Sequence, residues 1–191
     1  MKKNFLIALR VFLVLTIITG IIYPLVITLF ANVIYPGKSK GSMIYKDNKI
    51  IGSELIGQKF TSPEYFWGRP SAIDNNPMPS GGSNLGPTSR KLKNEVQARI
   101  DMIKKYHENI PIQQIPKDLL FASASGVDPD ISPEAAYFQI DRIAKARKMN
   151  MQQKKELYRL LSEYTRRPQY ELFGMPRVNV FLLNLVINNI K

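Results

Sequence analysis

The stretch VFLVLTIITGIIYPLVITLFANVIYPG, Val11 to Gly37, contains no charged side chain. At about 1.5 Å per residue, 20 helical residues cover the roughly 30 Å hydrocarbon core of a bilayer. A cleaved signal peptide has a shorter apolar run and small residues before the cut, whereas Leu29 stands where a small residue would be needed if Ala31 preceded a cut. Residues 11–36 therefore predict an uncleaved transmembrane anchor after a short N-terminal tail, residues 1–10. Gly20 and Pro24 inside the run are expected to bend it.

Basic side chains flank this span on both sides, so a count of positive charge does not fix its orientation. They are Lys2, Lys3 and Arg10 before the span, and Lys38, Lys40, Lys46 and Lys49 after it. By analogy with uncleaved signal sequences, we expect a single-pass protein of the cell membrane with its N-terminus in the cytoplasm and the bulk of the chain outside.

Composition excludes several classes of protein. The 191 residues carry a formal net charge of +12, no cysteine and one histidine, which rules out a disulfide scaffold, a Cys nucleophile and a zinc finger. No nucleic-acid-binding motif accompanies the basic charge, and the anchor argues against nucleic acid as a partner. Attraction to membrane lipid head groups or to acidic subunits fits the charge better.

Residues 38–191 are long enough to bury a core of their own. Apolar and aromatic residues between Gly and Pro breaks predict a strand pair near Ile50–Phe60 and Tyr65–Gly68. Arg69 to Pro87 is rich in Pro, Ser, Gly and Asn, which predicts a long loop that is functional or docked on a partner. A short buried strand is expected at Leu119–Ala122 and another around Val178 and Val180.

Three amphipathic helices are expected in this region. Thr88 or Ser89 caps the first, and Ser132 followed by Pro133 begins the second. The apolar faces comprise Leu92, Val96, Ile100 and Ile103, then Ala136, Ile140, Ile143 and Ala144, then Leu157, Leu160, Leu161 and Tyr164. Strands first and helices later predict one soluble α+β domain after the transmembrane helix.

Few residues could carry chemistry. His107 at a helix end is interpreted as a surface residue. Asp128 and Asp130 have the spacing of a cation-binding pair, but Pro129 between them favours a capped turn. The Gly-rich run from Ser80 to Ser89 lacks the Lys of a phosphate-binding loop. No metal ligands are assigned and no catalytic residue is predicted.

Ser42-Met43 close to the span leaves a second class open, a membrane-anchored Ser/Lys peptidase. Such an enzyme needs a buried Lys beside Ser42 to activate the hydroxyl, and no apolar strand carrying such a Lys is evident. A third possibility is a generic anchored binding module.

Five motifs follow the span in order: GSELIGQKF from Gly52, YFWGRPSA from Tyr65, SGGSNLGPTS from Ser80, SASGVDPDISPEAAYFQIDRIAKAR from Ser123 and RVNVFLLNL from Arg177. Together they closely resemble the C subunits of Kdp-type high-affinity potassium-transporting ATPases, the KdpC family. The resemblance implies an accessory, non-catalytic subunit that assembles or stabilises the complex and raises the ATP affinity of the P-type ATPase subunit. The implied partners are that subunit, a potassium-channel-like subunit and a small single-span subunit.

The resemblance also implies candidate site residues. Gln139 matches a glutamine linked to nucleotide contact in the family, although ATP is cytoplasmic and the expected topology places Gln139 outside. No cofactor is expected to bind tightly, and ATP would be met only in complex with the ATPase subunit. Two segments are expected to dock on the channel-like subunit, because loops and exposed aromatic residues are common interface material. The docking candidates are Tyr65, Phe66, Trp67, Arg69 and Pro70, and Gly81, Gly82, Ser83, Asn84, Gly86 and Pro87.

Overall fold

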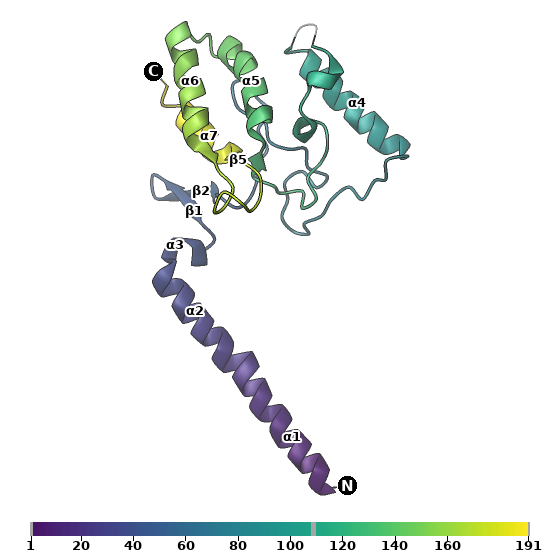
Figure 1. Cartoon of the computed structure of the whole chain (residues 1–191), viewed down its shortest axis with the longest axis vertical. Helices are drawn as coiled ribbons and strands as arrows, with labels where there is room; N and C mark the ends of the chain where they lie inside the picture. Colours follow the sequence, from purple (N-terminus) through teal and green to yellow (C-terminus); the bar gives the residue numbers. More distant parts are fainter. Residues whose placement is uncertain (1, 108–109, 191) are drawn as a thin grey trace. The chain divides into compact units, whose positions relative to one another are not determined.

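The structure is a computed structural model that describes residues 2–107 and 110–190. It divides the chain into two compact units, Met1–Ser53 (unit 1) and Glu54–Lys191 (unit 2). Unit 1 contains the long N-terminal helix, and unit 2 contains helices and a small sheet (Figure 1). The predicted α+β class, with one N-terminal apolar helix followed by a mixed domain, is confirmed.

Unit 1 begins with a helical stretch, Lys2–Ile34, that is long and apolar enough to cross a membrane. The mean hydropathy of its most apolar 18 residues is 2.6, and none of these residues is buried. It comprises α1 (Lys2–Ile17), a π-helical turn η1 (Ile18–Ile22) and α2 (Tyr23–Ile34). The helix therefore starts nine residues before the uncharged run and takes in Lys2, Lys3 and Arg10.

The π-helical turn lies next to Pro24. Proline has no backbone N–H, so the usual donor to the carbonyl of Gly20 is missing. The N–H of Tyr23 donates to the carbonyl of Ile18, five residues back, which widens the helix by one residue at this point. The helical path thus continues through the two residues that were expected to bend it.

A short helix and a β-hairpin complete unit 1: α3 (Pro36–Ser39), β1 (Met43–Lys46) and β2 (Lys49–Ser53). The antiparallel pair turns at Asp47 and Asn48, both with positive φ (51° and 59°), as a two-residue hairpin requires. The predicted pairing of Ile50–Phe60 with Tyr65–Gly68 is wrong, because β2 pairs with residues that precede it and ends at Ser53. Residues 65–68 belong to no strand.

Unit 2 contains α4 (Arg90–Lys104), the 3₁₀ turns η2 (Ile112–Gln114) and η3 (Lys117–Leu119), β3 (Asp130–Ile131), α5 (Pro133–Ala146), α6 (Met151–Tyr164), β4 (Thr165–Arg166), β5 (Arg177–Asn179) and α7 (Val180–Ile187). The three strands form one antiparallel sheet in the order β3-β5-β4. Helices α5 and α6 lie side by side in Figure 1 and contact each other, and α6 also contacts α7.

The three predicted helices are confirmed, with their caps. Ser89 accepts a hydrogen bond from the N–H of Leu92, and Ser132 accepts one from Ala135. Each helix buries the predicted face, and the most buried members are Ile100, Ile103, Ala136, Ile140, Ile143, Leu157, Leu160 and Leu161. Asn150 and Gln153 add a capping box at the start of α6.

The strand predicted at Leu119–Ala122 is wrong. Leu119 and Leu120 are buried as expected, but Lys117–Leu119 forms a 3₁₀ turn after Pro116. A short apolar run indicates burial without fixing the backbone conformation. Val178 lies in β5, whereas Val180 begins α7 behind the capping side chain of Asn179.

Candidate functional site

The segment Pro63 to Trp67 begins in a turn, belongs to no strand and is buried in part. Backbone N–H and C=O groups away from water need hydrogen-bond partners. Each of its five consecutive carbonyls accepts a hydrogen bond from a side chain of another part of unit 2. We call residues 63–67 the clamped segment. The donors are Arg142 to Pro63, Arg147 to Glu64, Arg142 to Tyr65, Asn184 to Phe66 and Gln139 to Trp67.

Two carboxamides hold consecutive residues of the clamped segment in both directions. Gln139 of α5 accepts from the N–H of Trp67 at 2.7 Å and donates to its carbonyl at 3.1 Å. Asn184 of α7 accepts from the N–H of Phe66 at 2.8 Å and donates to its carbonyl at 2.9 Å. The side chains thereby supply the bonds that a neighbouring strand would otherwise make. The strand predicted at Tyr65–Gly68 is therefore replaced by a non-strand segment that side chains hold in place.

Arg142 lies one helical turn after Gln139 and is 3% exposed. Its guanidinium donates to the carbonyls of Pro63 (2.5 Å) and Tyr65 (3.0 Å) and to Oε1 of Gln139 (2.6 Å), and it stacks 3.8 Å from the centre of the Trp67 ring. Burial lowers the pKa of Arg142 to about 10, with Tyr106 opposing the shift. The side chain therefore remains a cation at neutral pH.

Gln139 is 1% exposed, and both its polar atoms are hydrogen-bonded inside unit 2. The proposed nucleotide contact at Gln139 would compete with these bonds. In this structure the side chain serves as a bridge between α5 and the clamped segment.

The docking candidates of the first segment divide by burial. Phe66 (0% exposed) and Trp67 (7%) are core residues of unit 2, so their side chains point into their own domain. Tyr65 is half-buried under the guanidinium of Arg147, 4.9 Å from the ring centre. Arg69 and Pro70 are also half-buried, and they continue the clamped segment towards a second polar group.

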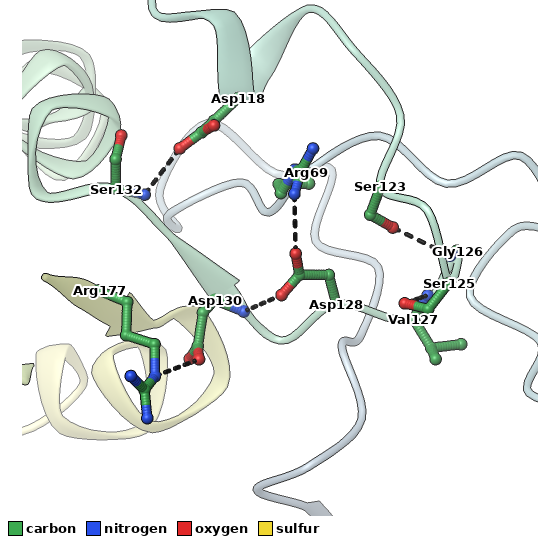
Figure 2. Close-up of polar contacts among 10 residues, drawn as sticks. All are labelled: Arg69, Asp118, Ser123, Ser125, Gly126, Val127, Asp128, Asp130, Ser132 and Arg177. Atoms are coloured by element: carbon green, nitrogen blue, oxygen red, sulfur yellow. Dashed lines mark hydrogen bonds and ion pairs between the residues drawn. The ribbon is translucent and has the colours of Figure 1, made fainter. Parts of the chain in front are cut away.

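That second group surrounds Asp128 and Asp130 (Figure 2). Arg69 donates to Asp128 at 2.9 Å, and the other oxygen of Asp128 accepts from the backbone N–H of Asp130 at 3.1 Å. Arg177 pairs with Asp130 at 3.0 Å. Burial raises the pKa of Asp130, Arg177 lowers it and Asp128 raises it further. The two aspartates thus close a turn, as their spacing around Pro129 predicted, and each has an arginine partner.

The run Ser80 to Pro87 is partly attached to this turn region. The N–H of Gly81 donates to the carbonyl of Ser125 at 3.0 Å. A Cβ on Gly82 would lie 2.9 Å from the carbonyl oxygen of Ala124, so glycine is needed for this approach. Gly81, Gly82 and Ser83 are half-buried, while Asn84, Gly86 and Pro87 are exposed. The second half of this loop is therefore exposed enough to dock on a partner.

His107 is half-buried, so its interpretation as a surface residue is wrong. Its ring stacks on Phe138 with centroids 4.4 Å apart. Burial lowers the pKa of His107, the charge of Arg142 lowers it further, and Asp141 opposes both. The histidine is therefore neutral at physiological pH.

A cavity of about 270 Å³ lies beside the junction of the clamped segment and Arg69. Its wall combines apolar side chains, among them Phe60, Trp67 and Ile103, with the charged pairs Lys59–Asp74 and Arg69–Asp128. Within residues 2–107 and 110–190, no group of three or more His, Cys, Asp and Glu side chains is placed to hold a metal ion.

Ser42 lies before β1 with a φ of 48°. Every lysine of unit 1 is exposed to solvent in the structure, whereas a Ser/Lys dyad requires a lysine whose charge is disfavoured by burial. Unit 1 offers no such residue among its described positions.

Sequence reasoning missed Arg142 and Asn184 as site residues. Arg142 lies unremarked inside the motif that begins at Ser123, and Asn184 lies inside the apolar motif that begins at Arg177. The signal that could have found them is a polar residue on the buried face of an otherwise apolar helix, since such a group needs a specific partner.

Comparison with known proteins identifies the family. Residues 5–189 match the family described as KdpC: K+-transporting ATPase, c chain. The chain is 45% identical over 193 residues to the potassium-transporting ATPase KdpC subunits of Burkholderia mallei (strain SAVP1) and Burkholderia pseudomallei (strain K96243), covering 98% of this chain and 97% of each relative. It is 46% identical over 192 residues to that of Janthinobacterium sp. (strain Marseille), covering 98% of this chain and 99% of the relative. The resemblance seen in the motifs is thereby confirmed, and the chain belongs to the KdpC family.

Proposed function

We propose that the protein is a single-span, non-catalytic subunit of an ATP-driven potassium-uptake complex, and that it assembles and stabilises this complex. The observation that carries the proposal is the full-length similarity to KdpC subunits of potassium-transporting ATPases. A helix able to span a bilayer, followed by a self-contained domain, suits a subunit that works through its neighbours.

The proposed partners are a potassium-channel-like subunit, a P-type ATPase subunit and a small single-span subunit. The proposed topology places the N-terminus in the cytoplasm and unit 2 outside. Unit 2 would then meet the channel-like subunit through the exposed half of the Ser80–Pro87 loop and the residues around Arg69.

We propose that any gain in ATP affinity is exerted across a subunit interface. Because the polar atoms of Gln139 are already bonded within unit 2, direct contact with the nucleotide would first have to break the clamp. In the proposed topology ATP lies on the other side of the membrane, so the effect would pass through the membrane-spanning parts.

Affinity purification of the tagged full-length chain from detergent-extracted membranes tests the assembly role. We expect a potassium-stimulated ATPase to co-purify, and we expect cells lacking the chain to yield less of the assembled complex. An ATPase that assembles to the same level and keeps its potassium and ATP affinities without this chain would contradict the proposal. Protease treatment of intact cells tests the topology, because cleavage in unit 2 requires that it lie outside.

A further inference from the structure

The connection between β4 and β5, residues 167–176, carries an unusual group of exposed apolar side chains. We call it the β4–β5 loop. Tyr170, Leu172, Phe173 and Met175 are 79%, 80%, 66% and 78% exposed. Single exposed apolar side chains are ordinary in soluble proteins, but four large ones within six residues of one loop indicate a surface that another apolar phase covers.

This loop is an ordered projection. Gln169 and Phe173 exchange backbone hydrogen bonds of 2.8 and 2.9 Å, and the N–H of Leu172 donates to the carbonyl of Gln169 at 3.2 Å. In Figure 1 the loop runs in yellow-green from the end of α6 into β5. The hairpin therefore holds its apolar side chains in place before any partner arrives.

The backbone of the loop adopts a conformation that its residues disfavour. Tyr170 and Glu171 have φ values of 54° and 59°, a region in which Asn and Gly are usual. Such strained positions collect at functional sites, where the surrounding structure holds them. Here Tyr170 and Glu171 form the tip of the hairpin, and Tyr170 and Leu172 are exposed there.

Charge around the loop is balanced. At its base Arg166 pairs with Glu54 and Arg177 with Asp130, and in the loop Arg167 lies 3.9 Å from Glu171. The tip itself adds no lysine. A partner that covers it is therefore recognised by apolar contact more than by net charge.

The bilayer is an apolar phase close to unit 2, because the N-terminal helix that enters it is joined to unit 2 by a short connection. Only 19 residues separate the end of α2 at Ile34 from the start of unit 2 at Glu54. At no more than about 3.6 Å per residue, this connection limits how far unit 2 can move from the membrane surface. Tyr and Phe together with Leu and Met are the side chains that enter the interfacial layer, and arginines beside them reach the head groups.

We propose that the β4–β5 loop inserts its apolar tip into the interfacial layer of the membrane that holds the N-terminal helix, as a second membrane contact of this chain. The inference rests on the proposed anchoring of that helix. It gives unit 2 a fixed side towards the lipid in addition to its covalent connection to the N-terminal helix.

Single-cysteine labelling tests the inference, since the natural chain has no cysteine. The full chain carrying Leu172→Cys is labelled with an environment-sensitive fluorophore and reconstituted into phosphatidylcholine nanodiscs that contain a nitroxide-labelled lipid. Met151→Cys, 73% exposed at the start of α6, is the matched control, and Leu25→Cys in α2 reports the anchor. We expect a blue-shifted emission and at least twofold stronger quenching at position 172 than at position 151.

The outcomes separate this inference from the anchoring on which it rests. Quenching at position 25 with equal, weak quenching at positions 172 and 151 overturns the loop insertion and leaves the anchor intact. Absence of quenching at position 25 overturns both. If the fluorophore at position 172 is shielded only after the purified potassium-transporting complex is reconstituted, again without lipid quenching, the loop docks on protein and the inference is wrong.

Discussion

Gln139 and Asn184, on two different helices, hold the backbones of adjacent residues in the same way: each carboxamide accepts from an N–H and donates to the carbonyl of one residue. One binds Trp67 and the other binds Phe66. This arrangement joins α5, α7 and the clamped segment into one structure, and it makes the carboxamides testable separately from the apolar core.

Asn184→Ala should destabilise unit 2. The change leaves the N–H and carbonyl of Phe66 buried without partners, which costs about 1–3 kcal/mol for each group. We expect the free energy of unfolding to fall by about 2–4 kcal/mol. This loss is measured by denaturant unfolding, with the fluorescence of Trp67 as the signal. Trp67 is the only tryptophan in the chain and lies in the clamped segment.

Asn189→Ala is the matched control for that experiment, because Asn189 is exposed just beyond α7. Its effect should stay within about 0.5 kcal/mol. Equal losses from the two variants would mean that Asn184 does not hold the clamped segment.

Gln139→Met tests whether this residue contacts nucleotide or holds the fold. Methionine has a similar length but no amide, so it loses both bonds to Trp67 and the contact with Arg142. We expect easier unfolding and a lower yield of assembled complex, while the complex that does assemble keeps its KM for ATP. A raised KM for ATP at unchanged stability and yield would instead favour nucleotide contact.

Acidification should weaken unit 2 through His107. Its pKa in the folded state is lowered by burial and by Arg142, so the unfolded state binds the proton more readily. The contribution of neutral His107 to the free energy of unfolding is complete above the pKa of histidine in the unfolded chain, about 6.5. It is lost as the pH falls from there towards the lower pKa of the folded state. The variant His107→Phe should show a smaller fall in the free energy of unfolding between pH 7.5 and 5.5, and identical pH profiles would refute this role.

Gly57→Ala should disturb the turn around Asp128. An added Cβ would lie 2.4 Å from the carbonyl oxygen of Asp128, so the backbone must move. We expect a loss of about 1–3 kcal/mol in unfolding experiments. Gly86→Ala is the control, since nothing lies within 4 Å of its added Cβ; if it costs as much, the close approach at Gly57 is not the cause.

Gly86→Arg tests docking by the exposed half of the Ser80–Pro87 loop. The domain has room for the new side chain, so unfolding should be unchanged, but a partner seated there would be displaced. We expect at least a threefold fall in co-purified ATPase. Met78→Arg adds the same charge at a position that is 81% exposed, and an equal fall for both variants would point to charge and away from docking.

The helices of unit 2 were predictable because their signals are local. Ser89 and Ser132 cap the helices that the apolar periodicity indicated, and the predicted faces are buried, most completely at Ile103, Ile140, Leu157 and Leu161. The long N-terminal apolar helix was predictable for the same reason. By contrast, Leu119–Ala122 is too short for periodicity to separate a strand from a 3₁₀ turn.

The clamped segment was not predictable from local pattern. Its partners lie 72 residues away at Gln139 and 118 residues away at Asn184. A short aromatic segment indicates burial, but a single sequence does not show that side chains, and not a neighbouring strand, bind its backbone. Phe66 and Trp67 were therefore assigned to a docking surface, although both lie in the core.

The distance along the chain between Phe66 and Asn184 has a consequence for biosynthesis. A ribosome completes residues 63–67 well before it reaches α7, so the backbone of Phe66 lacks its partner until Asn184, 118 residues later, has been added. A product truncated before Asn184 consequently leaves the N–H and the carbonyl of Phe66 without these bonds, and we expect proteases to cut such a product within the clamped segment.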